Sequence, residues 1–264
     1  ERAFPQKTLT EMVHNDRIIG GVTKGAAERA GELYRSFVKK EISLTDITTA
    51  ELVKVLENSF RDINIAFANE VARVCEGVGV DVWEAIALAN KHPRVNILSP
   101  GPGVGGHCIA VDPWFLLEGG VHSEFIKLAR NINDAAPHRV VNFIMEGMRD
   151  TKGARVGILG VAYKKNVGDS RETPAQPIIR ELLVNKCEVV LTDPYVKKFE
   201  YKLSPLSSVL KTSNCIVLVT DHDVYSEIDF KKYKNIEVVI DTRNFFKNMP
   251  KGIKHIRLGA TFPL

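Results

Sequence analysis

A cysteine directly follows the most glycine-rich segment of the chain, Gly101-Pro102-Gly103-Val104-Gly105-Gly106-His107-Cys108. Four glycines in six positions expose backbone N–H groups and let a phosphate or a sugar approach closely. Cys108 is then placed to attack a substrate carbon, provided that positive charge nearby favours the thiolate. Asp112, four residues on, is a candidate base. The alternative is a turn with an ordinary buried cysteine, and a metal site at His107 and Cys108 lacks further ligands.

A second group of polar residues has helical spacing. Lys54, Asn58 and Arg61 stand at i, i+4 and i+7, so they share one face of a helix. Two cations and an amide without an acidic residue at those positions can hold an oxyanion, a water and a phosphate. A solvated polar face is the alternative interpretation.

A third group follows the first strand of an expected parallel sheet. Lys164, Lys165 and Arg171 come after the apolar run at 155–160, where such folds place a phosphate site. The G-x-G-x-x-G fingerprint is absent from this turn, so it does not predict an ordinary dinucleotide domain. Arg243, after the fourth strand, adds a cation at the carboxyl edge of the sheet. Singly, each is typical of a surface charge; together at strand ends they favour a diphosphate ligand.

The elements that position these groups follow from hydrophobic periodicity. Helices are predicted over residues 24–40, 49–76, 82–90, 124–150 and 174–185, with a break at 18–21, N-cap chemistry at 43–46 and a further break at Pro137. Gly77 and Gly79 are expected to end the long second helix, which would form a spine. A Gly/Pro-rich loop is expected over 93–106. Short apolar runs predict buried parallel strands at 155–160, 188–192, 215–220, 238–241 and 255–258.

We therefore expect an α/β chain in which an all-helical part precedes a Rossmann-like, doubly wound parallel sheet. The predicted boundaries are a lead-in segment with a helix (1–40), a helical central part (41–150) and a C-terminal α/β part (151–264). The chain opens with Glu1-Arg2-Ala3-Phe4-Pro5 and no Met, which we interpret as a fragment.

Composition limits the function classes. A hydrophobic share of 44% with 26% charged residues is typical of a soluble globular protein. No apolar run approaches the roughly 20 residues that span a bilayer, so no membrane association is expected. The net charge of +4 suits a small anionic ligand and is too weak to indicate nucleic acid. Four dispersed cysteines without a C-x-x-C predict neither a disulfide scaffold nor a metal site, and indicate a reducing, cytoplasmic compartment.

Taken together, these motifs resemble the UDP-sugar 6-dehydrogenases of the UDP-glucose/GDP-mannose dehydrogenase family over the whole length of the chain. The matching segments are 1–5, 14–21, the Lys54–Asn58–Arg61 helix continuing to Glu70, the cysteine loop, the Tyr163-Lys164 turn and Asp241-Thr242-Arg243. The form of the loop favours the branch that acts on UDP-N-acetyl-D-mannosamine over the glucose or glucosamine branches.

The resemblance implies a four-electron oxidation of the sugar C6 by NAD, with an N-terminal NAD-binding domain that this chain lacks. The chain alone is therefore expected to be inactive. Cys108 would form a thiohemiacetal and then a thioester, which water hydrolyses. Lys54 would stabilise the oxyanion, Asn58 would position a water, Asp112 would assist deprotonation, and Glu1 occupies the place of a carboxylate associated with thioester hydrolysis.

The resemblance also implies a role for each part of the chain: 1–40 would be a remnant of the upstream domain with a lead-in helix, 41–150 the helical central dimerisation domain and 151–264 the C-terminal UDP-binding domain. It further implies contacts to substrate, to cofactor and to a second subunit. The expected sugar, phosphate and UDP contacts are Arg2, Ala3, Arg61, His92, Arg94, Gly105, Tyr163, Lys164 and Arg243. Arg171 matches a contact to the NAD pyrophosphate. A homodimer is expected, with His92 and Arg94 reaching across it and with pairing into a tetramer left open. The other hypotheses are a 6-dehydrogenase of UDP-N-acetylglucosamine or UDP-glucose, and a non-catalytic UDP-sugar-binding protein.

Overall fold

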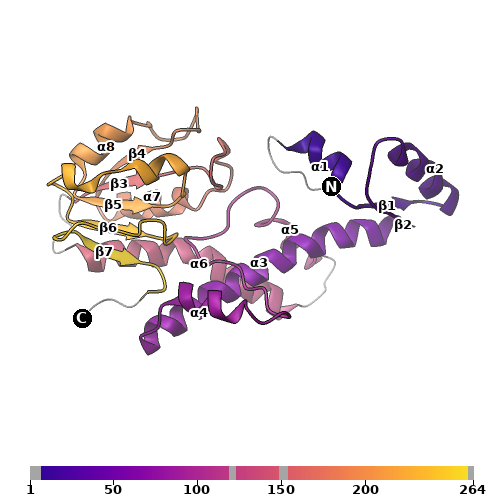
Figure 1. Cartoon of the computed structure of the whole chain (residues 1–264), viewed down its shortest axis with the longest axis horizontal. Coiled ribbons are helices and arrows are strands. Elements are labelled where there is room, and N and C mark those ends of the chain that lie inside the picture. Colours follow the sequence, from indigo (N-terminus) through magenta and orange to yellow (C-terminus); the bar gives the residue numbers. More distant parts are fainter. Residues whose placement is uncertain (1–6, 119–122, 149–153, 261–264) are drawn as a thin grey trace. The chain divides into compact units, whose positions relative to one another are not determined.

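The computed structural model describes residues 7–118, 123–148 and 154–260, which form two compact units, 1–60 and 61–264 (Figure 1). The boundary falls inside one long helix, α3 (Ile47–Val78). Glu1, Arg2 and Ala3, three of the expected site residues, lie outside the described residues. Within the described ranges, no helix combines the length and the hydropathy needed to cross a membrane.

The first unit is a small β-α-β arrangement. Strands β1 (Arg17–Gly21) and β2 (Ile42–Asp46) pair in parallel, and α2 (Lys24–Arg35) connects them; α1 (Thr8–His14) precedes β1. The expected break at 18–21 is wrong, because these residues form β1. Gly20 and Gly21 suit the strand because Ala50 and Ala27 approach them too closely for a side chain.

Helix α3 begins after β2 rather than after a free loop. The predicted N-cap segment 43–46 is mostly strand, yet Asp46 still has a capping role. Its carboxylate accepts hydrogen bonds from the backbone N–H and the hydroxyl of Thr49, at 2.9 and 2.7 Å. These bonds lower the pKa of Asp46. The long spine helix is thus confirmed. Gly77, which was expected to help end it, lies inside α3, and Gly79 follows the end of the helix with φ +78°.

The second unit contains a five-stranded parallel sheet of order β4-β3-β5-β6-β7. Its strands are β3 (Arg155–Leu159), β4 (Glu188–Thr192), β5 (Cys215–Leu218), β6 (Val238–Asp241) and β7 (Lys254–Arg257). All five predicted strands are present. Four of them contain at least two β-branched residues, whereas β7 has only Ile256. This confirms the expected doubly wound parallel sheet.

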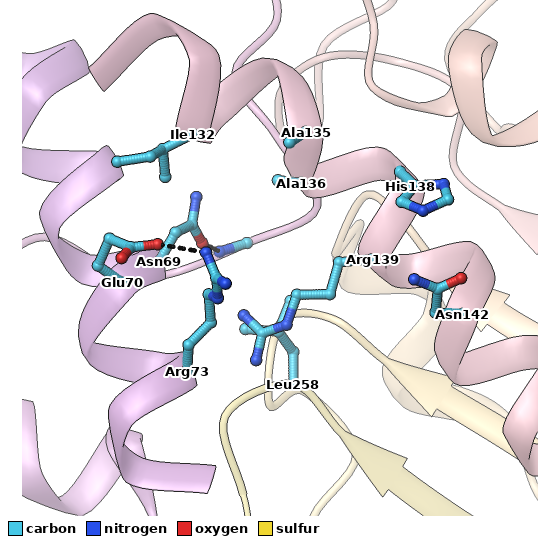
Figure 2. A pocket seen from close by; sticks show the side chains of 11 residues that line it. Asn69, Glu70, Arg73, Ile132, Ala135, Ala136, His138, Arg139, Asn142 and Leu258 are labelled. Carbon is cyan, nitrogen blue, oxygen red and sulfur yellow. Dashed lines mark hydrogen bonds and ion pairs between the residues drawn. The ribbon is translucent and has the colours of Figure 1, made fainter. Parts of the chain in front are cut away.

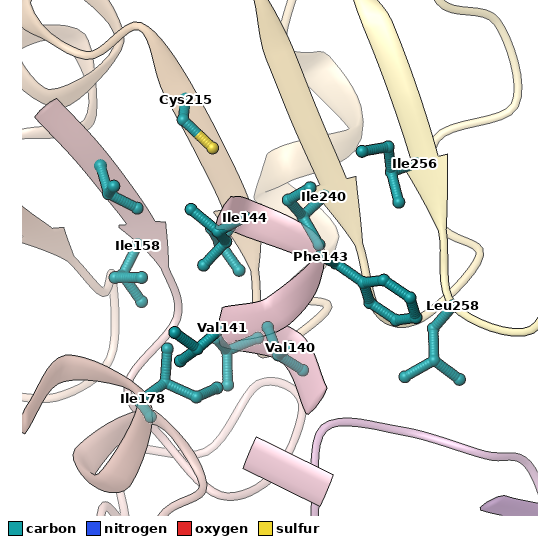
Figure 3. Packing of buried hydrophobic residues seen from close by; sticks show 14 of the residues in the cluster. Val140, Val141, Phe143, Ile144, Ile158, Ile178, Cys215, Ile240, Ile256 and Leu258 are labelled. Carbon is teal, nitrogen blue, oxygen red and sulfur yellow. The ribbon is translucent and has the colours of Figure 1, made fainter. Parts of the chain in front are cut away.

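Helices cover both faces of this sheet. On one face, α6 (Glu124–Gly147) and α7 (Ala175–Val184) pack with the strands in the larger hydrophobic core (Figure 3). On the other face lie α8 (Leu206–Thr212) and the 3-10 helices η2 (Asp223–Glu227) and η3 (Phe230–Lys232). Helices α4 (Val82–Ala89) and α5 (Asp112–Phe115) lie on either side of the Gly/Pro-rich loop.

The expected break at Pro137 is wrong: α6 runs through it without interruption. A proline inside a helix removes one hydrogen bond, but the turns that follow are anchored by burial. Figure 3 shows Val140, Val141, Phe143 and Ile144 of α6 among the side chains of the sheet. Packing of this face outweighs the loss of one backbone bond.

Candidate active site

The loop that leads to Cys108 is fixed by amide side chains on α3. Asn64 donates to the carbonyl of Asn96 and accepts from the backbone N–H of Leu98, both at 2.8 Å. One turn and a half further on, the side-chain oxygen of Asn69 accepts from the N–H of Gly101 at 2.9 Å. Side-chain hydrogen bonds from α3 thus bind the backbone of this loop at Asn96, Leu98 and Gly101.

Asn69 is itself held by a buried polar network between α3 and α6. Its Nδ2 donates to Asn133 Oδ1 at 3.2 Å, and Asn133 donates to the side chain and the carbonyl of Asp62, at 2.9 Å each. Arg130 forms a buried ion pair with Asp62. Burial raises the pKa of Asp62, and the Arg130 charge opposes this effect. Sequence reasoning missed these residues, although polar side chains on the buried stripe of a helix were a visible signal.

The glycines of the loop allow it to pack closely against the turn that follows β3. A Cβ at Gly105 would lie 2.6 Å from the carbonyl oxygen of Glu172 and 2.8 Å from Tyr163 Cβ. Gly106 has φ +86°, lies against the Tyr163 ring and donates its N–H to the carbonyl of Arg171 at 3.1 Å. These glycines therefore serve backbone packing in addition to any role toward a ligand.

Cys108 is the half-buried member of the four cysteines, since Cys75, Cys187 and Cys215 are buried. Its sulfur lies 3.1 Å from Nδ1 of His107. Its carbonyl accepts from the N–H of Asp112 at 2.7 Å, which fixes the cysteine to the start of α5. The Asp112 side chain is buried.

Positive charge lies near the Cys108 sulfur. The Arg171 guanidinium forms a two-pronged ion pair with Asp169, with contacts of 3.0 Å from Nε and 2.6 Å from Nη2. Asp169 raises the pKa of Arg171 most, and Cys108 acts in the same direction. Burial raises the pKa of the Tyr163 phenol, and the nearby Cys108 contributes in the same direction.

Arg243 connects the carboxyl edge of the sheet to the start of the cysteine loop. Its backbone N–H donates to Asp241 at 3.0 Å and its Nε donates to the carbonyl of Val219 at 3.1 Å. A Cβ at Gly101 would lie only 2.6 Å from the Arg243 Nη1. Burial lowers the pKa of this guanidinium, which still carries its charge at neutral pH.

The three cations expected at the diphosphate site differ in their surroundings. Lys165 forms an ion pair with Asp223 at 2.6 Å, and Arg171 is paired with Asp169 as described. Lys164 is half-buried.

Matches to known proteins agree with this arrangement. Two models of one family match: the central domain of the UDP-glucose/GDP-mannose dehydrogenase family over residues 48–135, and the UDP binding domain of that family over residues 157–248. The chain belongs to this family.

Individual relatives are similar over nearly the whole chain. A UDP-N-acetyl-D-mannosamine dehydrogenase of Methanococcus maripaludis is 48% identical over 94% of this chain and 60% of its own length. An NDP-N-acetyl-D-galactosaminuronic acid dehydrogenase of Ralstonia nicotianae is 43% identical over 93% and 60%. The solved structure of a UDP-D-ManNAc dehydrogenase from Pyrococcus horikoshii superposes with a TM-score of 0.91 at 40% identity, over 98% of this chain and 63% of that one. The chain thus spans about 60% of the length of these curated relatives.

Within the first unit, one candidate residue, Lys54, lines a cavity. A cavity of about 190 Å³ is lined by Asn15, Asp16, Ile18, Ala50, Val53, Lys54 and Glu57. Lys54 is half-buried, and the carboxylates of Asp16 and Glu57 line the same cavity. Asn58, one turn further along α3, is 1% exposed. The burial of Asn58 argues against a merely solvated face.

The remaining expected contacts lie at the surface. His92 and Arg94 occupy an exposed turn after α4, in which the Arg94 N–H lies 3.3 Å from Nδ1 of His92. Arg61 is also exposed. Exposure of these three side chains leaves them accessible to a ligand or to another chain.

A second hollow, of about 330 Å³, adjoins the network behind Gly101. Figure 2 shows Arg73 and Arg139 entering it from α3 and α6. Each arginine is paired with a carboxylate, Arg73 with Glu70 at 2.8 Å and Arg139 with Glu76. Because the charges are balanced, this hollow has little attraction for an anion.

Proposed function

We propose that this chain is the substrate-binding and nucleophile-bearing part of an NAD-dependent UDP-sugar 6-dehydrogenase whose substrate is UDP-N-acetyl-D-mannosamine. The observation that carries the proposal is the place of Cys108. It is a half-buried thiol, within electrostatic range of Arg171, in a loop that Arg243 and Tyr163 join to the carboxyl edge of the sheet. Ligands of doubly wound sheets bind at this edge.

The chemistry would use Cys108 to divide a difficult oxidation. Its thiolate attacks the C6 aldehyde, so a C–S bond forms and the carbonyl oxygen becomes the oxyanion of a thiohemiacetal. Loss of a hydride from C6 converts this adduct into a thioester. Water then displaces the thiolate and releases the uronic acid, so the cysteine is regenerated.

Lys54, Asn58 and Asp112 would serve this sequence in the roles that the family suggests. Lys54 would stabilise the oxyanion and carry protons, and Asn58 would hold the water. Support for these roles comes from the burial of Asn58 on α3, where an amide can hold a water away from bulk solvent. Buried Asp112, bonded through its backbone to Cys108, would assist deprotonation.

The nucleotide end would be held at the sheet. Tyr163, Lys164 and Arg243 would contact UDP, with Gly105, Arg61, His92 and Arg94 near the sugar and phosphates. Glu1, Arg2 and Ala3 would join them, although they lie outside the described residues. The predicted domain boundaries at 40/41 and 150/151 remain part of this proposal.

NAD would be held mainly by a part of the protein that the relatives have in addition to this chain. When bound, it supplies the hydride acceptor for both oxidations. The described residues fit one contact to it: Arg171 is exposed, and Nη1 of its guanidinium is not among the atoms that bind Asp169, so it could donate to a pyrophosphate. We therefore expect the chain alone to bind UDP-sugar without turning it over.

A homodimer would complete the protein. Large apolar side chains recur along one stripe of α3, at Phe60, Phe67, Val74 and Val78, each more than half exposed. A stripe of this kind is typical of a helix that packs against another chain. Light scattering should give a dimer or a tetramer; a monomer of the full-length protein would contradict this part of the proposal. All four cysteines are free, which supports a cytoplasmic setting.

The test uses the full-length protein that contains this chain. NADH formation is measured with UDP-N-acetylmannosamine, UDP-N-acetylglucosamine and UDP-glucose, and the first should have the highest kcat/KM. Activity on glucose alone would refute the choice of sugar. No activity on any of them, with UDP still bound, would indicate a non-catalytic UDP-sugar-binding protein.

A variant tests the role of Cys108 directly. Cys108→Ser should abolish formation of the uronic acid, because a serine alkoxide is neither formed as readily nor displaced as easily by water. Cys187→Ala removes a buried thiol and is the matched control, with activity expected to be near that of the unmodified protein. Uronic acid formed by Cys108→Ser at a near-normal rate would overturn the thioester assignment.

A further inference from the structure

His222 is a fully buried imidazole beyond the end of β5, and both of its nitrogens have partners. Nδ1 lies 2.8 Å from the backbone nitrogen of Asn166, and Nε2 lies 3.0 Å from Oδ2 of Asp193. A backbone N–H can only donate, so Nδ1 must be the acceptor and the proton must lie on Nε2. The ring is therefore neutral and donates to Asp193, which fixes its tautomer and orientation.

Asp193, just after β4, gathers backbone N–H groups from two segments. Its Oδ2 also accepts from Val161 and Ala162, at 2.8 and 3.0 Å, and its Oδ1 accepts from Tyr195 and Val196, at 2.8 and 2.9 Å. Burial alone would raise the pKa of this carboxyl, but these bonds and the one from His222 hold it below its ordinary value. Asp193 and His222 thus form one unit that touches both ends of the turn 161–166.

Further bonds fix the same turn. The Thr220 hydroxyl donates to the carbonyl of Ala162 at 2.5 Å. Asn166 has a left-handed φ of 56°, and its side chain exchanges two hydrogen bonds with Asp223, one from Nδ2 and one from the Asp223 N–H. Between these fixed points lie Tyr163, which contacts the cysteine loop, and Lys164.

We infer that His222 is a positioning residue for the diphosphate of the nucleotide. By joining Asp193 to the Asn166 backbone, it sets both ends of the turn and so places Lys164 and Tyr163 before a ligand arrives. A preformed turn avoids the entropy of ordering the ligand-binding residues upon binding. This inference rests on the proposed function, in which the turn binds UDP.

The first experiment measures the Kd for UDP by calorimetry on this chain, unmodified and as His222→Phe. Phenylalanine retains the ring volume next to Tyr195 and Tyr225 but supplies neither hydrogen bond. We expect UDP to bind about tenfold more weakly. His222→Asn, whose side-chain oxygen can replace Nδ1 toward Asn166, should recover part of the loss.

A control variant and a double-mutant cycle distinguish a positioning role of His222 from a general loss of stability. Leu210→Ala creates a cavity on α8, away from the turn, and should lower the thermal midpoint while leaving the Kd for UDP unchanged. In a double-mutant cycle with Lys164→Met, the two losses should be much less than additive, because His222 acts through Lys164.

Two other results would contradict the role of His222 or the proposed nucleotide site. If the unmodified chain binds UDP and His222→Phe binds it equally well, or if the two losses add fully, the role of His222 is wrong and the proposed function stands. If the unmodified chain does not bind UDP, both the inference and the proposed nucleotide site are wrong.

Discussion

The guanidinium of Arg243 fills the space that a side chain at position 101 would occupy: a Cβ there would lie 2.6 Å from Nη1. Arg243, two residues beyond the end of β6, thus packs directly against Gly101 in the cysteine loop. Nη1 is the far end of a long side chain, so a clash is relieved by displacing the guanidinium rather than the backbone.

Gly101→Ala should therefore weaken nucleotide binding more than it lowers stability. We expect a loss of about tenfold in affinity for UDP, because the displaced cation no longer meets a phosphate. Calorimetric titration with UDP, combined with thermal unfolding, measures both effects. Gly25→Ala is the control, since nothing lies within 4 Å of a Cβ at that position. Equal UDP affinity for both variants would disprove the role of the contact.

The four cysteines should differ in reactivity. Burial raises the pKa of Cys75, Cys187 and Cys215, whereas Cys108 is half-buried next to cationic Arg171. Iodoacetamide at neutral pH should therefore label Cys108 first, as peptide mass spectrometry can show. UDP-sugar should protect Cys108 if it binds over the loop. Preferential labelling of any of the other three would contradict the site.

The hydrogen bond from Gly101 to Asn69 should be worth a measurable part of the stability. Asn69→Ala leaves the buried Gly101 N–H without its acceptor and removes the Asn69 Nδ2 donor from the side-chain oxygen of Asn133. The expected cost is about 2 kcal/mol in the free energy of unfolding, measured by urea denaturation. Asn131→Ala, on the exposed side of α6, is the control and should change little. A cost near zero for Asn69→Ala would mean that the network does not hold the loop.

The ionisation of Asp241 should make the free energy of unfolding depend on pH. Burial alone would raise its pKa, but nearby His255 and the backbone N–H groups of Phe246 and Arg243 hold it below 3.8. Since the folded-state value lies below the unfolded-state value, the carboxylate stabilises the fold above pH 3.8. That contribution is lost as the pH falls through the folded-state pKa.

Asp241→Asn should thus be less stable than the unmodified chain at pH 7, by about 1–3 kcal/mol. The gap between the two should narrow as the pH falls below 3.8. Urea unfolding at several pH values measures it, with exposed Glu237→Gln as the control. A gap that stays constant down to pH 2 would exclude the carboxylate as the source.

The sheet could be predicted from the sequence because its signal is local. Strands β3 to β6 are short apolar runs with β-branched residues between turn residues, and buried strands of this kind need no partner to be recognised. The edge strand β7 has a weaker pattern, with Ile256 as its one β-branched residue. The spine helix was equally visible in its periodicity. Cys108, Lys164 and Arg243 could be proposed as site residues because strand ends and glycine loops are the places where parallel sheets bind ligands.

What the sequence could not supply was the contacts between distant segments. Pro137 was expected to break a helix, because the packing of Val140 and Ile144 on the sheet is not visible in local propensity. The segment at 18–21 was expected to break the chain, since only the pairing with β2 shows that it is a strand. His222 and Asp193 were missed, although both follow predicted strands, because a single histidine gives no sign of its two partners.

Helix α6 has two halves with different tasks. Arg130 and Asn133 near its start hold Asp62 of α3, and Val141 and Ile144 near its end lie in the core of the sheet. Gly147 lets its last turn come so close that a Cβ would be 2.9 Å from Ile256. One continuous helix therefore contacts the Asp62 network beside the cysteine loop with its first half and the core of the parallel sheet with its second half. In the proposed function, Cys108 and the turn 161–166 would therefore keep their relative positions when substrate enters and product leaves, because both are tied to this one continuous helix.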